Sequence, residues 1–186
     1  MSRLLSGVSG VLDFHGRAAR ASLLLCLVFI LSGCGAFSSA VSGTKSAMGL
    51  GSRPVTPDWK ALLITAAGNA NANSAVAVDL VLVKDAAMLE SLLSMPAAKW
   101  FSMRSDLQRT FPEALTVYSY ELVPTQLIRM DKKQFGHERV WAALVFAHYL
   151  SPGEHRTRLL LNTAGYVVQL NAQSFKAREI NTGTAQ

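Results

Sequence analysis

One cysteine stands where its thiol could be modified and the chain before it removed. Cys34 directly follows the small residues Ser32 and Gly33, which come after an eleven-residue apolar run from Ala21 to Leu31. Two arginines lie shortly before that run. A basic flank, an apolar segment too short to span a bilayer and small residues at a cleavage point are typical of a secretory signal peptide. The chemistry predicted for this segment is therefore peptide cleavage together with modification of a thiol.

The stretch Leu31-Ser32-Gly33-Cys34 resembles the lipobox of bacterial lipoproteins. This resemblance implies that the Cys34 thiol is joined to diacylglycerol, that cleavage leaves Cys34 as the first residue, and that its amine is also acylated. These covalent acyl chains are the only cofactor expected. Each buried methylene contributes about 0.8 kcal/mol, so one chain binds a membrane marginally and two or three hold stably. The alternative is a signal anchor with a coincidental cysteine.

Few other residues suggest chemistry. His148 and His155 flank one predicted turn, with Glu154 beside them. A metal would need both imidazoles on one face and a third ligand, whereas two histidines near a hairpin are usually surface residues, so no metal site is predicted. Asp79 and Glu121 could form a buried acid pair, although such residues more often face water. The sequence lacks the common nucleophile, phosphate-loop and zinc-protease motifs, so neither catalysis nor a small-molecule substrate is expected.

Removal of residues 1–33, the predicted lipoprotein signal peptide, changes the composition of the chain. The remaining 153 residues are enough for one domain with a hydrophobic core. The leader holds three of the 18 basic and one of the 12 acidic residues, which leaves 15 and 11 and a net charge of +4. A nucleic-acid surface would need clustered basic residues, so no nucleic acid is expected. No cysteine remains for a disulfide, so the core alone must stabilise the domain.

Residues 34–58 are predicted to form a lipidated flexible tether. Ser, Gly, Ala and Thr dominate this segment and cannot bury enough surface to offset the entropy of ordering. Some 22 such residues have a root-mean-square reach of roughly 25 Å. Gly35 follows the cysteine, where aspartate would retain an enterobacterial lipoprotein in the inner membrane. We therefore expect residues 59–186 to form a periplasmic domain, anchored to the inner leaflet of the outer membrane.

The periodicity of this domain predicts a mainly β fold, an antiparallel two-sheet sandwich with a small helical insertion after the second strand. Residues 140–150 are apolar on both faces, which indicates a central strand. The insertion covers about 85–111, with Asp85 as a helix N-cap, Pro96 as the end of a first helix and a second helix from Ser102. Seven short strands at close spacing favour a sandwich. They are predicted at 60–66, 75–83, 115–122, 126–130, 140–150, 156–161 and 166–170.

A polar loop joins the first two predicted strands. Its short side chains bond nearby backbone and tolerate left-handed conformations, and alternating Asn and Ala expose amide groups that could bond a partner. Loops on a rigid sandwich are a usual place for recognition; the alternative is a plain hairpin turn. Trp100, Phe101, Tyr118 and Tyr120 are further contact candidates, and for Trp100 and Phe101 a place in the core is the favoured alternative. The candidate loop comprises Gly68, Asn69, Ala70, Asn71, Ala72, Asn73 and Ser74.

Together these features resemble the outer-membrane lipoproteins of bacterial type VI secretion systems, the TssJ family, also called SciN/VasD-like. The resemblance is strongest over residues 62–93 and weaker at 121–124, where the family tends to have a Pro-Gly turn and this chain has Pro124-Thr125, and at 142–149. It implies a transthyretin-like scaffold, not an enzyme, whose lipid anchor ties a trans-envelope complex to the outer membrane. It also implies that the loop 68–74 contributes to binding the periplasmic C-terminal region of the IcmF-like inner-membrane component, TssM. The alternatives are another envelope lipoprotein, such as a pilotin-like or assembly subunit, and a periplasmic ligand-binding lipoprotein.

Overall fold

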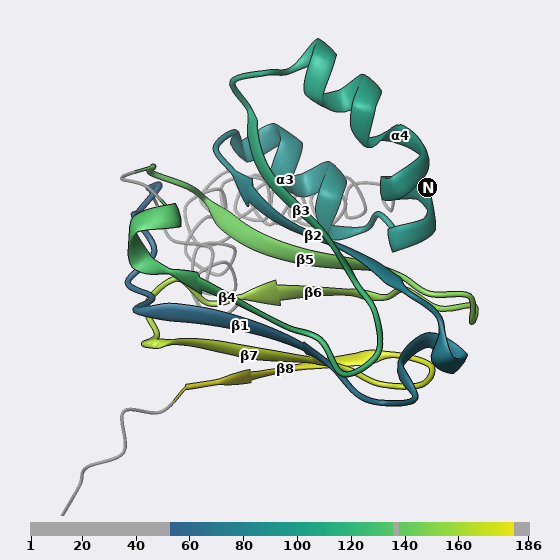
Figure 1. Cartoon of the computed structure of the whole chain (residues 1–186). Coiled ribbons are helices and arrows are strands. Elements are labelled where there is room, and N and C mark those ends of the chain that lie inside the picture. The colour runs from purple at the N-terminus through teal and green to yellow at the C-terminus, as the bar shows by residue number, and fades with distance from the viewer. Residues whose placement is uncertain (1–52, 136–137, 181–186) are drawn as a thin grey trace, which may run out of the picture. The chain divides into compact units, whose positions relative to one another are not determined.

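The computed structural model describes residues 53–135 and 138–180 (Figure 1). The chain divides into two units, Met1–Met48 and Gly49–Gln186, and all described residues belong to the second. The predicted signal peptide, the lipobox and Cys34 therefore lie outside the described residues. Of the helices that these residues form, none has the length and apolar character needed to cross a bilayer.

The described residues form two four-stranded sheets, which confirms the predicted two-sheet sandwich. The first sheet has the order β4-β1-β7-β8, and the second has the order β3-β2-β5-β6. The strands of the first sheet are β1 (Ala61–Ala66), β4 (Leu127–Asp131), β7 (Gly165–Leu170) and β8 (Phe175–Glu179). Those of the second are β2 (Val76–Val83), β3 (Leu115–Leu122), β5 (Ala142–His148) and β6 (Arg156–Leu159).

Two details of the sheets differ from the prediction. β1 and β7 run parallel, with Ala61 opposite Gly165, while the other strand pairs are antiparallel. The glycine permits this pairing because a Cβ at position 165 would lie 2.0 Å from the Ala61 carbonyl oxygen. The second difference is β8, which the sequence did not predict. In β8, charged residues alternate with Phe175 and Ala177, which are only partly buried, so its apolar signal is weak.

The predicted helical insertion is confirmed. Helix α3 (Ala86–Leu93) and helix α4 (Ala97–Thr110) follow β2. Asp85 is the N-cap of α3 and accepts a hydrogen bond from the Met88 backbone N–H at 2.7 Å. α4 begins at Ala97 rather than at Ser102. α3 ends at Leu93 with Ser94 as its C-cap, before the predicted end at Pro96, and Pro96 is the N-cap of α4, where its missing N–H carries no penalty.

Strand β2 is buried on both faces and joins two apolar layers. Its alternate residues Val76, Val78, Leu80 and Leu82 lie between the sheets, as the period-two pattern predicted. Val81 and Val83 face the other way, against α3 and α4, which cover the outer face of the second sheet (Figure 1). β5 is buried on both sides in the same way, which confirms its predicted central position. The domain therefore has three layers: helices, one sheet and the second sheet.

The first described residues already pack on the domain. The Val55 N–H donates to the Val140 carbonyl at 2.9 Å, and the Asp58 N–H donates to the Leu161 carbonyl at 2.8 Å. Trp59 is fully buried, its indole N–H donates to the Leu160 carbonyl, and its ring meets Phe135 edge-on. The chain thus joins the sandwich a few residues before the predicted tether ends at residue 58.

Candidate partner-binding site

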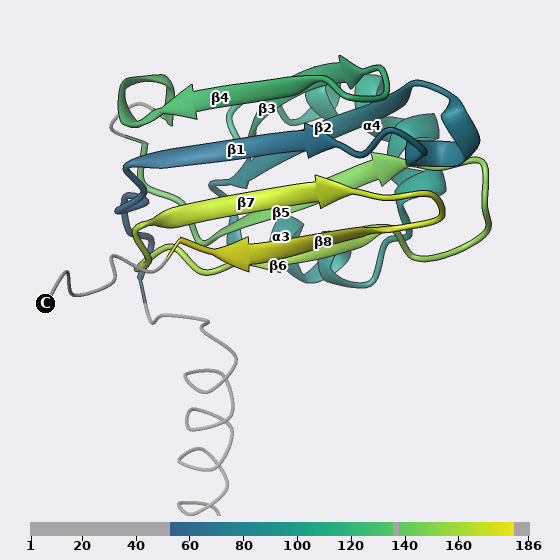
Figure 2. The same ribbon diagram turned by 60° about the horizontal axis from the view of Figure 1, so that its bottom comes forward.

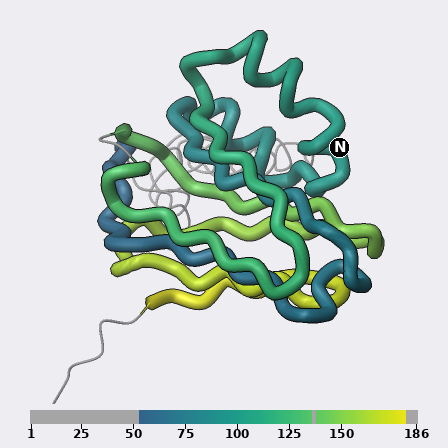
Figure 3. The backbone as a smooth tube through the Cα atoms, viewed as in Figure 1, coloured from purple at the N-terminus to yellow at the C-terminus, as the bar shows by residue number. Residues whose placement is uncertain are grey.

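Four connections meet at one end of the sandwich, which we call the loop end. They are the β1–β2, β3–β4, β5–β6 and β7–β8 connections, at residues 67–75, 123–126, 149–155 and 171–174. Figure 3 traces the backbone through them, and Figure 2 shows β1 and β7 running toward this end. The first described residues lie at the opposite end, because Val55 pairs with Val140, just before β5 begins. The predicted partner loop therefore lies at the end far from where the chain joins the domain.

Within the β1–β2 connection, Asn71 ties the loop end together. A short 3-10 segment, η2 (Ala70–Asn73), contains Asn71 with a backbone φ of 47°, a left-handed value that asparagine tolerates. The Asn71 side-chain amide donates to the Ala75 carbonyl, and its oxygen accepts from the Leu150 N–H, both at 2.8 Å. The Asn71 backbone N–H donates to the Asn171 carbonyl at 3.1 Å. Asn71 thus links its own connection to the β5–β6 and β7–β8 connections by hydrogen bonds.

Only part of the predicted loop can meet a partner through its side chains. Ala70 and Asn71 are buried, at 0% and 3% exposure. Gly68, Asn69, Ala72 and Asn73 are exposed. The expectation that the alternating Asn and Ala expose amide groups is therefore wrong for Asn71, whose side-chain amide bonds inside the domain. Partner binding by the loop itself stays a prediction.

Exposed leucine and valine side chains lie beside this loop. Leu150 is 74% exposed and Val123 is 55% exposed, on the β5–β6 and β3–β4 connections. Neither residue was predicted as a contact candidate, because Leu150 was placed inside the predicted strand 140–150 and Val123 in the turn after the strand 115–122. Apolar side chains set among polar amides form the kind of surface that anchors a protein contact.

The β3–β4 connection is a tight turn with an unusual residue in it. The Gln126 N–H donates to the Val123 carbonyl at 3.1 Å, and Thr125 has a φ of 70°. Pro at the second position and a positive φ at the third define a type II turn, where glycine or asparagine is favoured. Thr125 therefore occupies the place at which the family that the sequence resembles tends to have glycine. The Thr125 N–H also donates to the Ala66 carbonyl, which joins this turn to β1.

The two histidines near the β5–β6 turn point to different neighbours. A ring nitrogen of His155 lies 2.8 Å from the Ser151 carbonyl, and the ring packs against Tyr149 at 4.7 Å between centroids. His148 is exposed, with its ring 5.0 Å from that of Phe101. Within residues 53–135 and 138–180, no three His, Cys, Asp or Glu side chains gather as a metal site would need.

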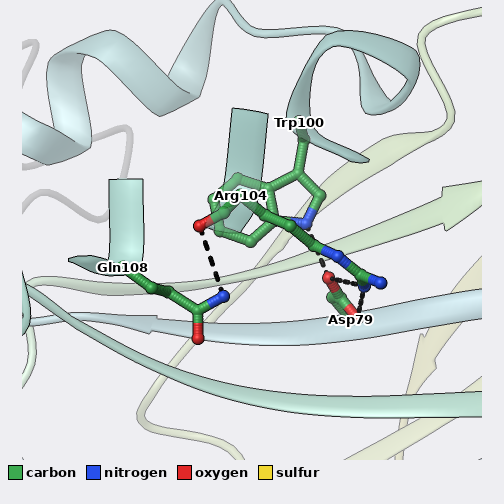
Figure 4. Close-up of polar contacts among 4 residues, drawn as sticks. All are labelled: Asp79, Trp100, Arg104 and Gln108. Atoms are coloured by element: carbon green, nitrogen blue, oxygen red, sulfur yellow. Dashed lines mark hydrogen bonds and ion pairs between the residues drawn. The ribbon is translucent and has the colours of Figure 1, made fainter. Parts of the chain in front are cut away.

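The suggested acid pair of Asp79 and Glu121 does not form. Asp79 is completely buried on the helix-facing side of β2, whereas Glu121 is exposed. The Asp79 carboxylate accepts from the Trp100 indole N–H at 2.8 Å and from the Arg104 guanidinium at 2.8 and 2.9 Å (Figure 4). Arg104 also lies over the ring of Phe101, 4.9 Å from its centroid. The Asp79 carboxylate therefore has a structural role, because its bonds to Trp100 and Arg104 join β2 to α4.

The four aromatic residues considered as contact candidates differ in how deeply they are buried. Trp100 is fully buried and stacks on Phe146 at 4.9 Å, which confirms its predicted place in the core, and Phe101 is half-buried. Tyr118 and Tyr120 are half-buried against the core between the sheets. Burial raises the pKa of both tyrosines above its usual value. Both tyrosines lie within β3, whereas Leu150 lies in a connection at the loop end.

Comparison with known proteins gives similar structures at low sequence identity. The type VI secretion lipoprotein TssJ1 from Pseudomonas aeruginosa is 16% identical, with a TM-score of 0.48 over 66% of this chain and 96% of that one. Serratia marcescens Lip, a membrane-bound component of the type VI secretion system, is 13% identical, with a TM-score of 0.44 and coverage of 66% and 96%. A structure of the type VI TssM C-terminal domain from EAEC is 14% identical, with a TM-score of 0.44 and coverage of 69% and 99%.

All three of these structures are of type VI secretion proteins. No family model matches the chain, and no curated protein matches it. The sandwich itself is established by the strand order and register described above.

Proposed function

We propose that this chain is an outer-membrane-anchored lipoprotein subunit of a type VI secretion membrane complex. In this role Cys34 carries the acyl chains, and the periplasmic domain binds the C-terminal region of a TssM-type, IcmF-like inner-membrane protein. The complex would thereby be tied to the inner leaflet of the outer membrane. The domain would act as a scaffold and not as an enzyme.

The observation that carries this proposal is the polarity of the sandwich. The chain joins the domain at the end where Val55 pairs with Val140, and the loop end lies at the other end of the strands. A six-residue strand such as β1 spans about 20 Å. An anchor attached before residue 53 would therefore leave the loop end, with Leu150 and the exposed face of η2, free to point away from the membrane.

The surface at the loop end suits a protein partner. Leu150 supplies an apolar anchor, and Asn69 and Asn73 supply exposed amides that can replace hydrogen bonds to water. Asn71 fixes the shape of the loop from inside, so little conformational entropy would be lost when a partner binds. Asp79 and His155 are engaged in structural contacts, which supports the scaffold role over a catalytic one.

The test measures binding of the purified lipoprotein in detergent to the periplasmic C-terminal region of the TssM-type protein encoded by the same organism. Calorimetry should give a Kd of about 1 µM or tighter. Leu150→Glu and Asn73→Arg should each weaken binding by at least about tenfold, because a charged or bulky side chain would interrupt the contact. Leu160→Glu is the matched control, since Leu160 is also exposed, at 40%, but follows β6 at the opposite end.

Each result has a defined meaning. Binding that Leu150→Glu and Asn73→Arg leave unchanged would keep the scaffold role and move the contact away from the loop end. No binding by the folded protein would overturn the proposal and favour another envelope lipoprotein function. The anchor is tested separately, because Cys34→Ser should move the protein from the membrane fraction to the soluble fraction.

A further inference from the structure

One side of the sandwich is open between two edge strands. β8 ends the order β4-β1-β7-β8, and β6 ends the order β3-β2-β5-β6. Figure 2 shows β8 at the lower edge of the first sheet, with β6 behind it. An edge strand presents unpaired backbone groups that can accept a further strand. This side runs along the strands and meets the loop end at the β5–β6 and β7–β8 connections.

The backbone of β8 directs three residues outward. The Asn171 N–H donates to the Ser174 carbonyl at 2.9 Å, and the Ile180 N–H donates to the Gly165 carbonyl at 2.8 Å. In an antiparallel pair, hydrogen-bonded and non-hydrogen-bonded residues alternate. Because Ser174 and Ile180 are hydrogen-bonded to β7 or its ends, the backbone groups of the even-numbered residues between them, Lys176 and Arg178, also point toward β7. The N–H and C=O groups of Phe175, Ala177 and Glu179 therefore point away from β7.

A hollow of about 790 Å³ lies beside this edge. Residues 151–157 of the β5–β6 turn and β6 form one wall, and residues 173–178 form the other. Phe175 and Ala177 are half-buried and pack on the core from this side. A strand added to β8 would place alternate side chains over the hollow, next to these two residues.

The opposite face of β8 is basic. Lys176 and Arg178 are both exposed and alternate with Phe175 and Ala177. Residues opposite one another on neighbouring strands share a face, and opposite charges there stabilise the pair by about 0.2–1 kcal/mol. An added strand would therefore be favoured if it carried acidic residues beside Lys176 and Arg178 and small apolar residues at the positions between.

We propose that the edge of β8 binds an extended segment of a partner protein by strand addition, and that this segment alternates acidic with small apolar residues. Backbone hydrogen bonds supply affinity in this mode, and alternate side chains supply specificity. The inference goes beyond the proposed function. The edge of β8 runs along the strands, and the hollow beside it adjoins the loop end only through residues 151–155 and 173–174. Lys176 and Arg178 could instead guard the edge against pairing, as charged residues on edge strands often do, and the test separates the two.

The probe is a short synthetic peptide in which valine and glutamate alternate, added to the purified lipoprotein in detergent. Amide hydrogen exchange is followed residue by residue. The outward N–H groups of Phe175, Ala177 and Glu179 should exchange about tenfold more slowly with millimolar peptide, because each gains a hydrogen-bond partner. A peptide in which valine and lysine alternate should protect them much less.

Two sets of variants make the test specific. Ala177→Pro removes an outward N–H without breaking a bond to β7, which edge strands tolerate, and it should abolish protection of Phe175 and Glu179. Ala177→Ser keeps the N–H and should leave protection unchanged. The double variant Lys176→Glu with Arg178→Glu should reverse the preference, so that the valine-lysine peptide protects β8.

Three outcomes would overturn the proposal. One is exchange at β8 that neither peptide slows, which would give the basic residues the role of an edge guard. Another is protection that Ala177→Pro leaves intact. The third is protection without reversal in the charge-swapped variant, since this would place the peptide elsewhere. None of these outcomes bears on binding at the loop end, so the proposed function is tested independently.

Discussion

The Asp79 carboxylate lies 2.8 Å from the indole nitrogen of Trp100, and Asp79 is completely buried. The two residues belong to β2 and α4, so this hydrogen bond joins the helix layer to the central strand of the second sheet. Arg104, one turn further along α4, adds two charge-assisted bonds to the same carboxylate. A buried carboxylate is costly unless it is paired, so the position of α4 and the charge of Asp79 depend on each other.

Loss of the Arg104 charge should therefore destabilise the domain. Arg104→Met should lower the free energy of unfolding by about 2 kcal/mol, below the 3–5 kcal/mol of a fully buried pair, because the Arg104 side chain is 32% exposed. Asp79→Asn added to that variant should recover about 1 kcal/mol, since it removes the unpaired charge and keeps an acceptor for Trp100. Urea unfolding measures both. Arg109→Met, at a side chain 79% exposed, is the control and should change little, and no recovery with Asp79→Asn would contradict this account.

The sequence predicted those elements whose own residues carry a clear signal, either an apolar pattern along a whole strand or a residue that favours a helix end. β2 and β5 alternate or run apolar over whole strands, and Asp85 and Pro96 mark helix ends by local chemistry. The parallel pairing of β1 with β7 could not be predicted, because a strand's pattern gives its burial and not its neighbour. β8 escaped notice because an edge strand with one half-buried face has few apolar residues.

Single residues of the site were harder to predict, because their roles depend on contacts with residues far away in the sequence. The ion pair of Asp79 with Arg104 joins residues 25 positions apart, and nothing in either segment specifies the other. Asn71 looks like its neighbours Asn69 and Asn73 in the sequence, and only the fold distinguishes the buried amide from the exposed ones. The exposure of Leu150 likewise depends on where β5 ends.

The difference between Asn71 and Asn73 can be measured. Asn71→Ala removes two side-chain hydrogen bonds, one within the β1–β2 connection to the Ala75 carbonyl and one to the Leu150 N–H, and it places alanine at a φ of 47°. We expect the free energy of unfolding to fall by about 2 kcal/mol. Asn73→Ala keeps those bonds and should cost under about 1 kcal/mol, although its φ is also positive. Equal losses in thermal unfolding would show that Asn71 does not hold the loop end.

Thr125 should be a site of stabilisation. Its φ of 70° is rare for a β-branched residue and costs about 1–2 kcal/mol. Thr125→Asn should raise the free energy of unfolding by about 0.5–1 kcal/mol, because asparagine tolerates the left-handed region. Thr125→Val, which keeps the branch at Cβ, is the control and should give no gain. Calorimetry should show a higher Tm for the asparagine variant only, and a lower Tm would rule out strain at this turn.

Gly165 should be intolerant of any side chain. Its φ is 141°, and an added Cβ would approach the Ala61 carbonyl oxygen to 2.0 Å. Because that carbonyl belongs to the parallel pair of β1 and β7, Gly165→Ala should cost about 3 kcal/mol or more. Gly68→Ala is the matched control, since its nearest atom in space would be 3.9 Å away. A Gly165→Ala protein as stable as the control in urea would contradict the parallel register.

Tyr149 should make the domain sensitive to alkaline pH. Burial raises the pKa of its hydroxyl from 10.0 to about 12, and the neutral hydroxyl donates to the Ser174 carbonyl at 2.9 Å. The unfolded chain loses this proton near pH 10 and the folded chain only near pH 12, so the stabilisation is complete below pH 10 and is lost as the pH rises to about 12.

Tyr149→Phe isolates this contribution from that of the other tyrosines. At neutral pH the variant should be less stable by about 1 kcal/mol, the usual value of one hydrogen bond. Between pH 10 and 12 it should lose less stability than the unmodified protein, by at most about 2–3 kcal/mol, because phenylalanine has no proton to lose. Urea unfolding at a series of pH values measures both curves. Parallel curves across this range would mean that the Tyr149 hydroxyl titrates alike in the folded and unfolded chain, and that the contact with Ser174 does not hold its proton.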